Sequence, residues 1–151
     1  MRLSHRSHTR ATPAEVWDLL GTPSRWPQFD LFFARVRGAG GQAAAGQHLL
    51  AVGRGAPVRI PVDVLEVVPE RRLVMRVHTA PGLREEVRYE LTPALRGGCD
   101  ISAAVVVDGL FARPAVLPLW LSRGASVRVL AARTDRTARA ERRGRRRGLS
   151  A

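Results

Sequence analysis

The sequence contains no lysine and only one cysteine, Cys99, in 151 residues. A single cysteine excludes an intramolecular disulfide framework and a metal site built from several thiolates. The longest apolar run, residues 115–121, contains a proline and is far shorter than the roughly 20 residues that span a membrane. Residues 1–10 hold three arginines and no apolar segment, so no secretory signal is expected and the expected localisation is cytoplasmic.

Positive charge is abundant and unevenly spread. All 25 basic residues are arginine and they face 13 acids, for a net charge of +12; eight arginines and two acids lie in residues 133–151, which therefore carry half of the excess. The tail can be a solvated helix end, or it can dock on the phosphates of nucleic acid or of an anionic membrane. It has no interleaved aromatic residue, which argues against stacking on single strands.

The rest of the composition is that of one globular domain, with 45% hydrophobic and 25% charged residues. We expect a folded domain over residues 1–138 and an arginine-rich tail over residues 139–151, either disordered or a frayed helix.

Local patterns predict strands in the middle of the chain and helices near its ends. Residues 2–11 alternate weakly, and Thr12, Pro13 and Glu15 then supply a helix start that Gly21 ends. A second short helical turn reaches Trp26. Six further strands are predicted over residues 31–37, 47–52, 58–68, 72–78, 83–91 and 100–107.

Everything after residue 110 is predicted as one helix whose first half is apolar nearly all round. Strands separated by tight turns pair antiparallel, and helices placed outside the run of strands give an α+β fold. The prediction is a curved seven-stranded antiparallel sheet with two short helices after the first strand and a long C-terminal helix over the concave face.

Particular segments resemble a known superfamily. These are PAEVWDLL at residues 13–20, RWPQF at 25–29, VLEVVPERRLV at 64–74 and RYELTP at 88–93. They resemble the START-like (SRPBCC) superfamily of polyketide cyclase/dehydrases and lipid-transfer proteins, over about residues 3–138. The resemblance implies the helix-grip fold and a cavity between sheet and C-terminal helix that binds a hydrophobic or aromatic small molecule. No cofactor is expected.

Five residues are candidate ligand contacts in such a cavity. Tyr89, the only tyrosine, falls on the apolar face of its strand and can donate to a ligand or to a backbone carbonyl. Met75 can line the cavity or belong to the core, and Trp26 can close one end or act as a structural anchor. Trp120 and Arg123 lie one helical turn apart; the arginine can bind a ligand oxygen or extend to solvent.

Whether the chain is an enzyme is left open by the sequence. Cyclases that resemble it use a tyrosine shortly after the Trp-Pro and an arginine on a central strand. The corresponding positions here are Phe33 and Glu66 or Val67, so that mechanism cannot be carried over. Phe33 remains a ligand-contact candidate. Glu66 becomes a candidate general base if it points inward, or part of a solvated outer face if it does not.

No metal is expected. The histidines are scattered over several predicted strands, and the two that are close in sequence point to opposite faces; they are His5, His8, His48 and His78. Cys99 is expected to be a small buried or turn residue. Three functions remain open: a polyketide cyclase/dehydrase-like protein, a non-catalytic lipid or hydrophobic-ligand binding or transfer protein, and a binder of anionic surfaces through the tail.

Overall fold

A computed structural model describes residues 2–38, 40–110 and 112–148, without the side chains of residues 113–117, 119, 120, 147 and 148. The helical elements are α1 at Pro13–Leu20, the 3-10 helix η1 at Pro23–Gln28, and α2 at Ala112–Gly148. The strands are β1 (Arg2–Thr9), β2 (Phe33–Arg37), β3 (His48–Gly53), β4 (Arg59–Val68), β5 (Arg72–Ala80), β6 (Leu83–Pro93) and β7 (Cys99–Gly109).

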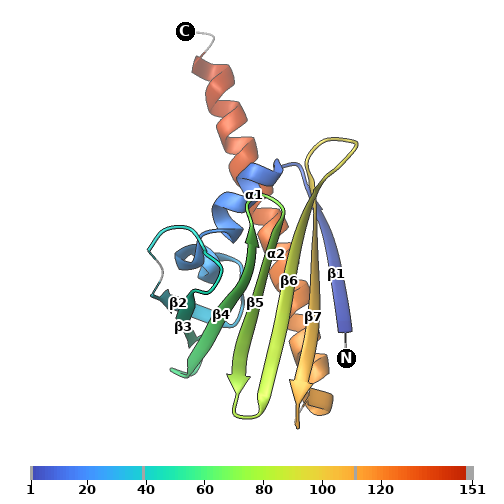
Figure 1. The fold of residues 1–151 in the computed structure, drawn as a ribbon. Coiled ribbons are helices and arrows are strands. Elements are labelled where there is room, and N and C mark those ends of the chain that lie inside the picture. The colour runs from blue at the N-terminus through green and yellow to red at the C-terminus, as the bar shows by residue number, and fades with distance from the viewer. Residues whose placement is uncertain (1, 39, 111, 149–151) are drawn as a thin grey trace.

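The strands form one sheet in the order β1-β7-β6-β5-β4-β3-β2, and every neighbouring pair is antiparallel. The helix α2 runs along one face of this curved sheet and continues past its end (Figure 1). It packs on β1 and β7. The predicted α+β helix-grip architecture is therefore confirmed.

The start of α1 follows from its capping residues. The backbone N–H of Glu15 donates to the Thr12 hydroxyl at 3.2 Å, and the Thr12 N–H donates to the Glu15 carboxylate at 2.7 Å. This reciprocal capping box satisfies two amides that the helix itself leaves unpaired. The Gly21 N–H then bonds to the carbonyl of Trp17 and ends the helix, as predicted.

The core lies between the concave face of the sheet and the helices. Buried side chains alternate with exposed or half-buried ones along β6 and β7, so each strand gives one face to the core. The side chains of α1 that point inward, including Val16 and Leu20, are fully buried against the same core. Across the described part of the chain, no helix combines the length and the apolar character needed to cross a membrane.

An irregularity in β4 reverses which residues face the core. The pairing of β4 with β5 shifts register between Val64 and Glu66, so Leu65 is an extra residue in the strand. Strict alternation from the buried Val64 would turn Glu66 inward, but the inserted residue places it on the outer face. There its carboxylate accepts a hydrogen bond from Arg72 at 3.0 Å.

Candidate functional site

One carboxylate lies on the buried face of β6. Leu83, Val87, Tyr89 and Leu91 occupy that face, and Glu85 stands among them with 0% of its surface exposed. A buried carboxylate is costly unless it is paired and hydrogen-bonded. The partners of Glu85 therefore define the polar centre of the concave face.

Arg123 of α2 supplies the opposite charge. Its Nε donates to Glu85 Oε2 at 3.1 Å, and its Nη1 donates to Asp30 Oδ2, which follows η1 in sequence. The hydroxyl of Thr79 on β5 donates to the other Glu85 oxygen at 2.5 Å. Arg123 is 1% exposed and Asp30 2%. We call these four residues, together with the adjacent Tyr89, the buried charge cluster.

The surroundings keep the guanidinium of Arg123 charged. Burial by itself lowers the pKa of Arg123, but the carboxylates of Asp30 and Glu85 more than offset this and raise the pKa above its usual value. The rings of Phe32 and Phe33 lie 5.2 and 5.9 Å from the guanidinium carbon and add cation–π attraction. Arg123 is thus a fixed positive group inside an apolar layer.

Two polar atoms of the cluster, the hydroxyl of Tyr89 and Nη2 of Arg123, make no well-aligned hydrogen bond among the described residues. Arg123 nevertheless lies close enough to Tyr89 to act on the pKa of its hydroxyl. Tyr89 is 0% exposed, and its ring packs edge-on against Phe29 with centroids 6.3 Å apart. Burial raises the pKa of Tyr89, with Arg123 opposing that rise, so the phenol stays protonated. An unmade hydrogen bond in the interior costs about 1 to 3 kcal/mol per group.

The cluster can therefore donate hydrogen bonds to one more oxygen. Two carboxyl groups, those of Asp30 and Glu85, already share one arginine, so an additional anion would find no free positive charge. A neutral acceptor such as a ketone, ester or amide oxygen needs no such charge. The two unpaired donors fit an acceptor of this kind.

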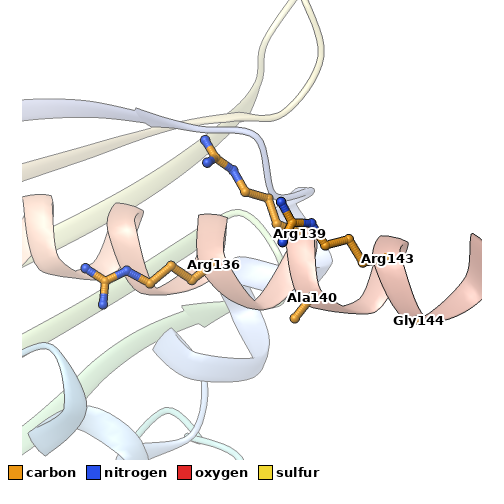
Figure 2. Close-up of a pocket in the computed structure, with 5 residues that line it drawn as sticks. All are labelled: Arg136, Arg139, Ala140, Arg143 and Gly144. Carbon is orange, nitrogen blue, oxygen red and sulfur yellow. The ribbon is translucent and has the colours of Figure 1, made fainter.

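None of the surface pockets described here is lined by Asp30, Glu85, Tyr89 or Arg123, and one of them reaches Thr79. One of about 700 Å³ is at the β5–β6 hairpin, lined by residues that include Val58, Pro61, Thr79 and Arg84. Another of about 570 Å³ lies along the C-terminal half of α2 (Figure 2). Thr79 lines the first pocket and also bonds to Glu85, so it connects the outside of the hairpin to the cluster.

A second polar group occupies the outer face. Asp63 Oδ1 lies 2.7 Å from Nδ1 of His48, and its Oδ2 lies 2.9 Å from Nε2 of His78. His48 and His78 lie on separate strands that are far apart in sequence. Because β3, β4 and β5 are neighbours in the sheet, both histidines reach the carboxylate of Asp63. Among residues 2–38, 40–110 and 112–148, no group of three or more His, Cys, Asp or Glu side chains is placed to hold a metal ion.

A scan against family models matches residues 1–142 to the family described as polyketide cyclase / dehydrase and lipid transport. The chain belongs to this family. No curated protein matches the sequence. The match covers β1 through most of α2 and agrees with the architecture above.

Solved structures share the fold of this family member. MLL2253 from Mesorhizobium loti has a TM-score of 0.74 at 18% identity, covering 91% of this chain and 98% of its own. A protein from Rhodobacter sphaeroides has a TM-score of 0.66 at 24% identity, covering 92% of both chains. DynU16, a protein in the dynemicin biosynthetic locus, has a TM-score of 0.69 at 19% identity, covering 87% of this chain and 46% of its own.

The structure of this family member brings together five of the candidate ligand contacts. Trp26, Phe33, Tyr89 and Met75 all lie in the core, and Arg123 contacts Phe33. The indole N–H of Trp26 donates to the carbonyl of Leu20 at 2.7 Å and its ring stacks on Phe33, which is the arrangement of a structural anchor.

Of the two remaining candidates, one stands apart from this group and the side chain of the other is not described. Glu66 lies on the outer face beside Arg72, away from the cluster. Trp120 lies in α2, but its side chain is outside the described residues.

Sequence reasoning missed Asp30 and did not select Glu85. Glu85 had a usable signal, since it is the one charged residue on the apolar face of β6. Asp30 had none, because it follows a short 3-10 helix and its role depends on a partner 93 residues away. Cys99 is buried, and burial raises the pKa of its thiol, which makes it a weak nucleophile.

Proposed function

We propose that this chain binds a small hydrophobic or aromatic molecule that carries a neutral oxygen acceptor, on the concave face of the sheet beside the buried charge cluster. The observation that carries the proposal is the pair of unpaired buried donors, Tyr89 Oη and Arg123 Nη2, in an otherwise apolar layer. A ligand carbonyl placed between them would accept a hydrogen bond from each.

Binding is favoured over cyclase catalysis. The positions that correspond to the cyclase tyrosine and arginine are Phe33 and Glu66 or Val67, and Glu66 is engaged with Arg72 on the outer face. The carboxylates that do lie inside, Asp30 and Glu85, are both held by Arg123. The cluster is built to position an acceptor oxygen.

The experiment compares 2-acetylnaphthalene with 2-ethylnaphthalene, which has a similar shape but no carbonyl. We expect the wild-type chain to bind the ketone more tightly. Tyr89→Phe should weaken ketone binding about five-fold, the effect of one hydrogen bond, and leave the hydrocarbon unchanged. Dissociation constants from naphthalene fluorescence give both comparisons.

The stability of the same variant shows whether a loss of affinity comes from a damaged fold. Because the hydroxyl makes no well-aligned hydrogen bond without ligand, Tyr89→Phe should lower the free energy of unfolding by less than about 1 kcal/mol. Native mass spectrometry of the purified protein adds a search for a carried-over molecule. Equal affinity of the wild type for both naphthalenes, or binding of neither, would contradict the proposal.

A further inference from the structure

The C-terminal part of α2 leaves the body of the protein. Ala138 is 1% exposed and is the last buried residue in the described part of the helix. Every side chain from residue 139 to residue 146 is exposed, and the helix extends beyond the end of the sheet (Figure 1). We call residues 139–148 the arginine arm. The arm is separate from the ligand site, so a function of the arm is independent of ligand binding there.

The charge of the arginine arm is almost entirely positive. The arm holds six arginines and one acid, Glu141. The arginines whose side chains are described are Arg139, Arg142, Arg143, Arg145 and Arg146. Figure 2 shows Arg139 and Arg143 on the helix together with Arg136, with the small Ala140 and Gly144 beside them. These five residues line the shallow 570 Å³ depression on α2.

The sequence of the arm does little to stabilise its own helix. Arg139 and Arg143 are four residues apart and Arg142 and Arg145 three, spacings at which like charges repel. Gly144 costs about 1 kcal/mol in a helix relative to alanine. The contacts that hold the arm include an ion pair from Arg139 to Asp135 and a hydrogen bond from Arg142 to the Arg10 carbonyl. A polyanion would remove the repulsion.

The distribution of charge discriminates between polyanions. At 3.6 residues per turn, the five arginines whose side chains are described cover about 160° of the helix circumference. An interfacial membrane helix instead needs an apolar face, and the arm contains no side chain more apolar than alanine. A wide band of charge suits a groove, in which phosphates stand on both sides of the helix.

The dimensions fit one kind of groove. The major groove of B-form DNA is about 12 Å wide and admits an α-helix, whereas that of duplex RNA is too narrow. The arm is about 15 Å long and carries no aromatic residue on which single-stranded bases could stack. We propose that the arginine arm docks in the major groove of double-stranded DNA through phosphate contacts, without reading its sequence.

The test measures binding of the full chain to a fluorescein-labelled 20-base-pair duplex by anisotropy over a range of salt concentrations. The arm variant carries Arg143→Gln, Arg145→Gln and Arg146→Gln. The matched control loses the same charge elsewhere on the surface, through Arg59→Gln, Arg84→Gln and Arg96→Gln. Far-UV circular dichroism and thermal melting verify that both variants are folded.

Each phosphate contact contributes about −0.9 to the slope of log K against log salt concentration. We expect a wild-type slope of about −4 to −5. In the arm variant the magnitude of the slope should fall by nearly 3, with a large loss of affinity. The control should behave like the wild type. Equal losses in both variants would show that net charge alone binds DNA. Tighter binding to phosphatidylserine vesicles, equal binding to a single strand, or no binding to the duplex would each overturn the proposal.

Discussion

At the scale of single residues, the most consequential group is the arginine that joins the helix to the sheet. Arg123 holds two carboxylates that reach it from different segments, and all three are buried. A buried ion pair adds little compared with an apolar core, but breaking it leaves charge without compensation in the interior. The folded state therefore requires that all three members of the cluster are present.

Arg123→Met tests this dependence. Removing the guanidinium leaves Asp30 and Glu85 buried without a cation, so we expect the free energy of unfolding to fall by about 3 to 5 kcal/mol. Arg128→Met makes the same change at an exposed position of the same helix and should cost less than about 0.5 kcal/mol. Urea unfolding followed by circular dichroism measures both; similar losses in the two variants would show that the cluster is not what the fold depends on.

At the scale of elements, the contact of α2 with β1 depends on a glycine in the helix. Gly124 faces the ring of His5, and a Cβ at this position would lie 2.6 Å from His5 Cε1. In the sequence, Gly124 is an isolated glycine inside a helical pattern, which is a cost to the helix. Only its neighbour on β1 explains it.

Two glycines of α2 should respond in opposite ways to the same change. Gly124→Ala gains up to about 1 kcal/mol in helix propensity but loses about 1 to 3 by overpacking, so it should be destabilising. Gly144→Ala meets nothing within 4 Å and should be neutral or slightly stabilising. Thermal melting of both variants measures the two effects. A higher melting temperature for Gly124→Ala would show that His5 on β1 moves aside at little cost.

A second element-scale contact joins three neighbouring strands at Asp63. Hydrogen bonds from His78 and His48 lower the pKa of this carboxyl below its usual 3.8. A lowered pKa in the folded state stabilises the protein above about pH 4, and this contribution disappears as the pH falls through the lowered value.

Asp63→Asn should therefore be less stable than the wild type at pH 7, and the difference should shrink at pH 3. Urea unfolding at the two pH values measures it, with Asp108→Asn, an exposed carboxylate at the end of β7, as the control. If the loss at pH 3 equals the loss at pH 7, packing of the side chain matters and its charge does not.

At the scale of the whole molecule, the chain has a packed body and a basic extension. Packing of α2 on the body ends at Ala138, and the residues beyond it are solvated along the described part of the helix. The sequence-based division into a domain over residues 1–138 and a tail over residues 139–151 stays a prediction. The repulsive, exposed extension contributes little to the core.

A chain that ends at residue 138 should therefore fold. It loses the Arg139–Asp135 ion pair and the contact of Arg142 with the Arg10 carbonyl, both weak surface contacts, and it also loses repulsion among the arginines. We expect the melting temperature to change by less than about 4 °C, which is about 1 kcal/mol for a protein of this size. A larger fall would show that residues 139–151 belong to the folded domain.

Much of the fold was predictable because its signals are local. Period-two alternation and turn glycines located all seven strands to within a few residues, and Thr12 with Glu15 located the start of α1. The inward position of Tyr89 followed from the same alternation. Each of these features depends on residues that are close in sequence, and the regular backbone of a strand or helix fixes how such residues are arranged.

Only the tertiary structure decided which charges meet. Asp30, Glu85 and Arg123 lie 38 to 93 residues apart and no local pattern links them. One inserted residue in β4 turned Glu66 outward, and the adjacency of β3, β4 and β5 brought His48 and His78 to Asp63. The sequence by itself determined the strands, the helices and the basic extension, because these follow from local periodicity and composition. The polar centre exists only where the folded sheet and α2 close on each other, because burial is what compels distant charges to pair.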